Sequence, residues 1–124
     1  MAVPSLKMNS GHEIPQVGLG LWQNKDEQAC RDSVKWALAA GYRHFDDAQA
    51  YDNEEFLGEA LKESGVERGD VFVTTKIAVK NFGYNHAKKS FKVSLKKLQT
   101  EYVDLLLLHF PVRSPQSIGC SPAL

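Results

Sequence analysis

Two hydrophobic patterns alternate along the chain, and each predicts a different secondary structure. Short runs of apolar and β-branched residues predict strands, whereas longer stretches with apolar residues three or four positions apart predict helices. The predicted strands, in chain order, are residues 17–22, 44–46, 71–75 and 102–108. Before them, the runs 5–8 and 13–17 flank the turn-forming sequence Asn9-Ser10-Gly11, which predicts a β-hairpin.

Three amphipathic helices are predicted between these strands. Asn24 and Glu27 have the spacing of a capping box, and the helix that they begin ends at Gly41. Asn53 can cap the second helix, which Gly65 ends. The apolar stripes of the three helices are Cys30, Val34, Ala37 and Leu38; Phe56, Leu57, Ala60 and Leu61; and Ala87, Phe91, Leu95 and Leu98.

The order of these elements predicts an α/β fold with parallel strands joined by crossover helices. Leu105–Leu108 is apolar without alternation, as is typical of a parallel strand covered on both faces. Two architectures fit the pattern: a small doubly wound sheet, and the N-terminal half of a (β/α)8 TIM-type barrel, which normally takes about 250 residues. The pattern stops after Pro111, and residues 113–124 have no clear period.

Composition and charge narrow the class of protein. The 15 basic and 15 acidic residues balance, so the charge favours neither nucleic acid nor an anionic membrane surface as the main partner. Residues 1–5 lack a basic start to a signal peptide, and the longest apolar run is far too short to span a bilayer. Cys30 and Cys120 do not make a disulfide framework, so we expect a cytoplasmic protein.

Four residues with chemically active side chains follow the predicted strands. Asp46 ends the second strand and Tyr51 lies in its exit loop, while Lys76 and His109 follow the third and fourth strands. The C-terminal ends of parallel strands share one rim, which is where the active sites of barrels lie. We therefore expect these four side chains to converge.

Such a set is suited to reducing a carbonyl group. A phenol is a weak acid, with a reference pKa of about 10, and a nearby ammonium group favours release of its proton. Lys76 could therefore make Tyr51 a proton donor, Asp46 would orient Lys76, and His109 could hydrogen-bond the carbonyl oxygen. Since the set supplies a proton and no hydride, a cofactor is required.

Each of these residues also has an ordinary structural interpretation. Taken alone, Lys76 could form a surface ion pair, and His109 could be a buried histidine with its hydrogen bonds satisfied. Cys30 lies on a core stripe and is expected to be an inert small hydrophobe. The remaining histidines fall on different elements, so no metal site is expected.

Longer motifs resemble the aldo-keto reductase family. Residues 41–54, with the sequence GYRHFDDAQAYDNE, closely resemble the first signature of that family, and Lys76 follows Val73-Thr74-Thr75 as it does there. The stretch leading to the active-site histidine of the family resembles residues 94–98, 102–105 and 109–111. The resemblance covers about residues 5–112, so we expect a partial barrel over 1–112 and a tail, 113–124, that does not resemble the family.

The resemblance implies a barrel that transfers hydride from NADPH, or alternatively NADH, to an aldehyde or ketone. The implied catalytic residues are Asp46, Tyr51, Lys76 and His109, with Tyr51 as the proton donor. Asp46 and Asp47 are implied near the nicotinamide ribose. The residues implied to contact substrate are Trp22, Tyr51, His109 and Phe110.

Departures from the family pattern add further expectations. Asp47 stands where the family commonly has Ser, Thr or Cys, and its charge could alter the cofactor contacts. Ala78 stands where many members carry a Trp, which predicts a roomier or different substrate site. The second half of the family's barrel does not follow residue 112, so we expect a truncated chain with little activity by itself. The alternatives are a non-catalytic half-barrel that self-associates or binds a partner through open strand edges, and a small doubly wound binding protein.

Overall fold

The computed structural model describes residues 3–111, so the expected tail 113–124 lies outside the described residues. A hairpin of β1 (Ser5–Lys7) and β2 (Glu13–Pro15) comes first, as the sequence predicts. The strands and helices that follow are β3 (Leu19–Gly20), α1 (Glu27–Ala39), β4 (His44–Asp46), α2 (Glu54–Ser64), β5 (Phe72–Ile77), α3 (Tyr84–Lys97) and β6 (Leu105–Leu108). Three short 3-10 helices are η1 (Gln49–Tyr51), η2 (Arg68–Asp70) and η3 (Val79–Asn81).

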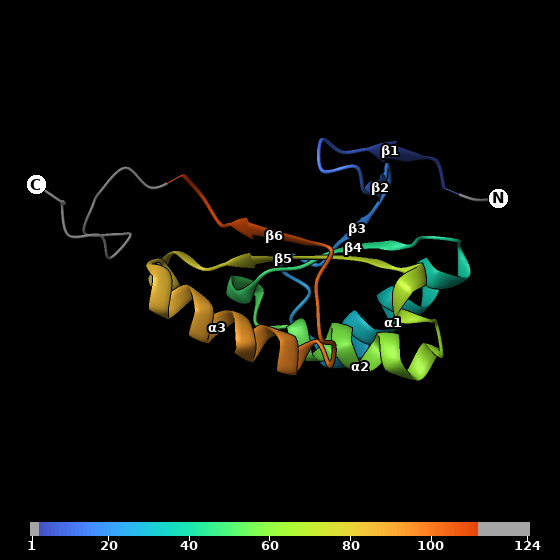
Figure 1. Cartoon of the computed structure of the whole chain (residues 1–124). Helices are drawn as coiled ribbons and strands as arrows, with labels where there is room; N and C mark the ends of the chain where they lie inside the picture. The colour runs from blue at the N-terminus through green and yellow to red at the C-terminus, as the bar shows by residue number, and fades with distance from the viewer. Residues whose placement is uncertain (1–2, 112–124) are drawn as a thin grey trace, which may run out of the picture.

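The parallel sheet decides between the two predicted architectures. Its strands lie in the order β3-β4-β5-β6, which is also their order in the sequence. The helices α1, α2 and α3 all lie on the same face of this sheet (Figure 1). A doubly wound sheet has helices on both faces and reverses its strand order, so that alternative is excluded. Sequential parallel strands with helices on one side form half of a (β/α)8 barrel, which confirms the barrel prediction.

The core lies between the sheet and the helices. Its fully buried side chains include Phe45 of β4, Leu57 of α2 and Val34 of α1. Cys30 is also fully buried, and its burial, followed by the charge of Asp47, raises the pKa of the thiol to about 11. A buried neutral thiol is unreactive, which agrees with the expectation from its place on the stripe. Among the described residues, no helix has both the length and the apolar character needed to cross a bilayer.

The cap of the first helix differs from the prediction. The N-cap of α1 is Asp26, whose side chain accepts a hydrogen bond of 2.8 Å from the backbone N–H of Ala29. Asn24 therefore forms no capping box with Glu27. Its carbonyl instead accepts a hydrogen bond of 2.8 Å from Nδ2 of Asn53. The cap lies two residues later than expected because Asp26 supplies the capping oxygen, while Nδ2 of Asn24 donates to the hydroxyl of Ser33 at 3.3 Å.

Asn53 occupies the predicted N-cap position of α2 but does not cap it with its side chain. The side chain is 1% exposed, and its Nδ2 donates to the carbonyls of Leu21 and Asn24 at 2.9 and 2.8 Å. Asn53 thus ties the start of α2 to the loop after β3. The helix ends at Gly65, as predicted, with a φ of 70° that favours glycine.

The last strand is less covered than its sequence suggests. Leu105 is half-buried, but Leu106, Leu107 and Leu108 are 41%, 40% and 67% exposed. β6 pairs with β5 on one side, and in residues 3–111 no other strand pairs with its second side. The prediction of a strand covered on both faces is therefore wrong for the described part of the chain.

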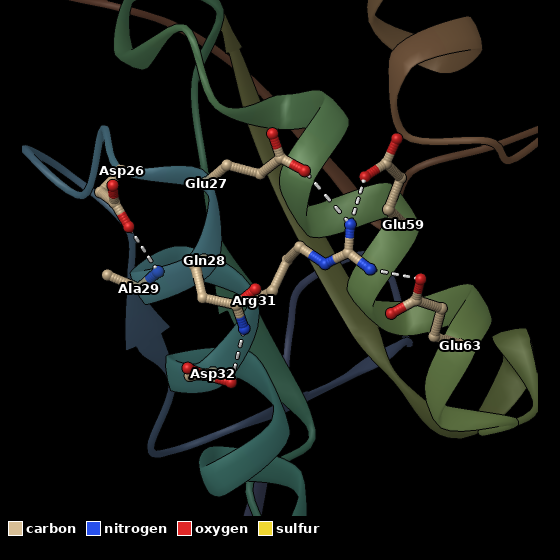
Figure 2. A network of polar contacts seen from close by, with 8 residues as sticks. All are labelled: Asp26, Glu27, Gln28, Ala29, Arg31, Asp32, Glu59 and Glu63. Atoms are coloured by element: carbon tan, nitrogen blue, oxygen red, sulfur yellow. Dashed lines mark hydrogen bonds and ion pairs between the residues drawn. The ribbon is translucent and has the colours of Figure 1, made fainter.

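An ion-pair network joins α1 to α2 on the outer surface (Figure 2). The guanidinium of Arg31 on α1 contacts Glu27 on its own helix and both Glu59 and Glu63 on α2. These carboxylates, with Glu63 the first cause, raise the pKa of Arg31. Because the carboxylates of Glu27 and Glu63 are exposed, we expect the network to add little to the free energy of unfolding.

Candidate active site

Lys76 is the centre of the polar cluster at the C-terminal end of the sheet. Its Nζ donates to Asp46 Oδ1 at 2.8 Å, to the backbone carbonyl of Asp47 at 2.9 Å and to the Tyr51 hydroxyl oxygen at 3.3 Å. The Lys76 side chain is 13% exposed. An ammonium group has three N–H donors, so all three are used and the group is held in one orientation.

Tyr51 reaches this cluster from the short helix η1, which follows β4. Its hydroxyl oxygen accepts from Lys76, and Nζ also lies 4.9 Å from the centre of the Tyr51 ring. Because Lys76 has only donors, the hydroxyl hydrogen of Tyr51 is not used in this contact. That hydrogen is therefore available to a third group, which is the arrangement that a proton donor needs.

His109 completes the cluster from the residue after β6. Its ring meets the Tyr51 ring edge to face, with centroids 5.6 Å apart and an interplanar angle of 83°. Burial, followed by the charge of Lys76, lowers the pKa of His109 below its ordinary value of 6.5, although Asp46 opposes this change. This direction favours the neutral imidazole. Nδ1 is buried and has no hydrogen-bond partner among the described residues.

The four predicted side chains therefore lie together at one end of the sheet. Asp46 and Tyr51 are both hydrogen-bonded to Lys76, and the ring of His109 contacts the ring of Tyr51. The convergence has a simple topological cause, because β4, β5 and β6 are parallel neighbours in the sheet. Their C-terminal ends must share a rim.

A pocket of about 330 Å³ opens beside His109. It is lined by Gln49, Ala50, Asp52, Ala78, Val79, Lys80, His109 and Phe110. Phe110 stacks on His109, with ring centroids 4.5 Å apart, and has a φ of 99°, which is strained for a residue with a side chain. Of the residues predicted to contact substrate, His109 and Phe110 line this pocket, whereas Tyr51 and Trp22, which is 69% exposed, do not.

Asp47 is placed differently from its neighbour Asp46. Asp47 is the first residue after β4, and its carboxyl has no exposed surface. Its Oδ1 accepts from the Ala48 N–H at 2.7 Å, while Oδ2 has no partner among the described residues. Burial is the main cause that raises the pKa of Asp47 to about 7, and the charge of Glu54 acts in the same direction. The hydrogen bond from the N–H of Ala48 opposes them by lowering the pKa. The Asp47 carboxyl is thus buried in this structure, in contrast to that of Asp46, which is 39% exposed.

Glu54 is a buried polar residue that the sequence pattern did not indicate as part of the site. It is 3% exposed, and its Oε1 accepts a hydrogen bond of 2.6 Å from the hydroxyl of Thr75. The sequence places Glu54 in the first turn of a helix, where an acid is normally exposed. The sequence did hold one signal for this contact. Thr75 is next to Lys76 on the same strand, so its side chain points to the opposite face, where the helices lie.

Metal ligation has no support in this cluster. Within residues 3–111, no group of three or more His, Cys, Asp or Glu side chains is placed to hold a metal ion. The amine, phenol and carboxylate that meet at the rim are joined through Lys76, which is a cation and does not bind metals.

The aldo/keto reductase family model matches residues 16–118 of the chain. The chain belongs to the aldo-keto reductase family. The match contains the whole cluster described above and confirms the resemblance found in the sequence. It also includes residues 113–118, part of the segment that the sequence pattern separates from the family.

Individual aldo-keto reductases match over most of this chain. The methylglyoxal reductase of Escherichia coli O157:H7 is 45% identical over 113 residues, which are 90% of this chain and 40% of that enzyme. The crystal structure of an aldo/keto reductase from Brucella melitensis is 46% identical, with a TM-score of 0.88 over 94% of this chain and 45% of the other. A Bombyx mori aldo-keto reductase in complex with NADP is 37% identical, with a TM-score of 0.80 over 90% of this chain and 39% of the other.

These alignments also give the extent of the family fold that is present. The chain spans about 40% of the length of the curated relatives that it matches. The part that it forms is the first half of an aldo-keto reductase barrel, with the hairpin and the first four parallel strands.

Proposed function

We propose that this half-barrel carries the proton-donating site of a reductase that converts aldehydes or ketones to alcohols with NADPH. The observation that supports the proposal best is the set of three hydrogen bonds from Lys76 to Asp46, to the carbonyl of Asp47 and to Tyr51. An ammonium held in this way stabilises the phenolate that remains after Tyr51 has given up its proton. The proposal takes NADPH as the cofactor because a family member is known in complex with NADP. NADH is the alternative.

Reduction of a carbonyl group requires a hydride at carbon and a proton at oxygen. The nicotinamide, when bound, supplies the hydride. Tyr51 then gives its hydroxyl proton to the carbonyl oxygen, and solvent restores that proton after the alcohol leaves. The neutral ring of His109 can donate one N–H to the same oxygen, which orients the carbonyl group and stabilises its developing negative charge.

The residues at the rim fit a cofactor through one contact of their own. The Asp46 carboxylate is 39% exposed while Oδ1 accepts from Lys76, so it can accept a further hydrogen bond from a ribose hydroxyl. The pocket of about 330 Å³ beside His109 would take the substrate, with the carbonyl group reaching out of it toward Tyr51, which does not line the pocket. Its walls at Ala78 and Phe110 suit an apolar group next to the carbonyl. Trp22 would contact substrate only from outside this pocket.

A titration with NADPH and an assay with an aromatic aldehyde test the proposal. The chain alone should bind NADPH weakly and turn over at a near-background rate, because positioning of reactants is worth about 7–11 kcal/mol and Asp46 is its one proposed cofactor contact. The second barrel half of the Escherichia coli relative, added in trans or fused, should restore both binding and turnover. Absence of turnover in a folded complete barrel would contradict the proposed function. Tight binding and turnover by the chain alone would contradict the need for the second half.

The exposed edge of the sheet supports a second candidate, a half-barrel that acts through self-association. Leu106, Leu107 and Leu108 are exposed beside the edge of β6 that no strand of residues 3–111 covers, and such edges favour pairing between chains. We expect the chain to sediment as dimers or larger species and Leu108→Lys to shift it toward monomer. Trp36→Lys is the matched control, because Trp36 and Leu108 are both 67% exposed and Trp36 lies on α1. A stable monomer before any substitution would argue against this function.

A further inference from the structure

The side-chain amide of Gln49 is hydrogen-bonded at both of its ends. Its Nε2 donates to the hydroxyl of Ser94 at 3.0 Å. Its Oε1 accepts from the backbone N–H of Ala78 and from Nδ2 of Asn81, both at 2.9 Å. One side chain thus joins η1 to α3 and to the segment that follows β5. Ser94 is 1% exposed, and the contact as a whole is partly buried.

Gln49 and Tyr51 belong to the same short helix, so the hydrogen bonds of Gln49 bear on the position of Tyr51. Gln49 is the first residue of the three-residue helix η1, and Tyr51 is its last. A helix this short has little stability of its own, and the N–H of Tyr51 is bonded to the carbonyl of Ala48. Just beyond it, Asp52 has a φ of 57°, so the chain turns away. The orientation of η1 must therefore be fixed by contacts outside it.

Two side-chain contacts hold η1 against the end of β5. Gln49 contacts the backbone of Ala78, and Tyr51 contacts the side chain of Lys76. Gln49 and Tyr51 are two residues apart on η1, and Lys76 and Ala78 are two residues apart at the end of β5. A movement of η1 that breaks the Gln49 contacts would therefore also change the distance between the Tyr51 hydroxyl and Nζ, which is 3.3 Å here.

We propose that Gln49 is a positioning residue that holds the Tyr51 hydroxyl against Lys76. That this positioning serves catalysis rests on the proposed function. The effect of Gln49 on the contact between the Tyr51 hydroxyl and the Lys76 ammonium does not depend on it. Gln49 lines the proposed substrate pocket but forms no hydrogen bond with the Tyr51 hydroxyl or the Lys76 ammonium. It acts through the main chain of η1 and through Ala78.

A coupling measurement on the full chain tests this inference without cofactor or turnover. Tyrosine labelled with ¹³C at Cζ gives one signal for each of the 4 tyrosines, and Tyr51→Phe identifies that of Tyr51. Lys76→Met removes the ammonium and should displace the Tyr51 signal. In a Gln49→Met background the same change should displace it by less than half as much, because the phenol is no longer held at the ammonium. Met has a length similar to Gln but makes none of the three hydrogen bonds.

Two matched variants separate positioning from general destabilisation. Gln28→Met changes an exposed Gln that bonds only Asp32 on α1, and it should leave the displacement unchanged. Gln49→Glu keeps an acceptor for Ala78 and Asn81 and should retain more than half of the displacement. If Gln49→Met does not fold, Asn81→Leu, which removes one donor to Gln49, should still reduce the displacement.

Three results would overturn the inference. The first is an equal displacement in the Gln49→Met and unsubstituted backgrounds, and the second is no displacement by Lys76→Met in the unsubstituted chain. The third is a loss in Gln28→Met as large as that in Gln49→Met. If the complete barrel lacks turnover but the coupling is lost as expected, the proposed function fails and the positioning role of Gln49 stands.

Discussion

Replacing Asp47 with Asn is expected to stabilise the fold at pH 8 by up to about 4 kcal/mol and to have little effect near pH 4. The carboxyl of Asp47 is fully buried, and its Oδ2 has no hydrogen-bond partner among the described residues. Burial raises its pKa from 3.8 to about 7, with the charges of Glu54 and Asp46 acting in the same direction. Ionised Asp47 therefore costs folding free energy that a neutral amide at this position would not.

The sign of the pH dependence follows from the two pKa values. Between pH 4 and 7 the folded chain keeps the Asp47 proton that the unfolded chain releases. The free energy of unfolding should fall as the pH rises through this range and level off above pH 7. In Asp47→Asn this contribution is absent, so the gain of the variant should grow from pH 4 to pH 7 and then stay constant.

Urea unfolding at several pH values checks this expectation, and the difference between the variant and the unsubstituted chain isolates the one carboxyl. The amide of Asn can accept the Ala48 N–H as Asp47 does, and its NH₂ removes the repulsion from Glu54. Asp52→Asn, at an exposed position of the following loop, serves as the control and should keep the original pH dependence. A stability difference for Asp47→Asn that is the same at pH 4 and pH 8 would contradict the raised pKa.

Much of the fold could be predicted because its signals are local. The β-branched run before Lys76, the turn residues of the hairpin and the helix end at Gly65 each depend on a few neighbouring residues. Neighbouring residues could not decide between the two sheet architectures, because the answer depends on which face of the sheet each helix packs against. The exposure of Leu106–Leu108 was not local either, since an apolar run does not show which elements lie beside it.

The same distinction applies to the site. Asp46, Lys76 and His109 could be predicted because each lies at or next to the C-terminal end of a strand, and parallel topology alone brings such ends together. The buried pair of Glu54 and Thr75 and the triple contact of Gln49 could not, because they join segments more than 20 residues apart through side-chain rotamers. Asn53 shows the intermediate case. Its position at the start of α2 was predictable, whereas its use as a tie between loops was not.

Tyr51→Phe is expected to lower kcat of the completed barrel by about 10²–10⁴-fold, which is the usual contribution of a general acid. The substitution removes only the hydroxyl that accepts from Lys76, and the ring that meets His109 remains. NADPH affinity should therefore stay nearly unchanged, since the proposed cofactor contact belongs to Asp46. Fluorescence titration and the aldehyde assay measure the two quantities separately.

Tyr84→Phe is the matched control for this substitution, because Tyr84 is 80% exposed on α3 and its ring lies beside Lys88 rather than the cluster. It should keep full turnover. Lys76→Met should also lose turnover, because the phenolate left after proton transfer would lack its ammonium partner at 3.3 Å. The two losses should not add in the double variant, since both act through the same proton. Full turnover in folded Tyr51→Phe would show that another group delivers the proton and would remove Tyr51 from the proposed mechanism.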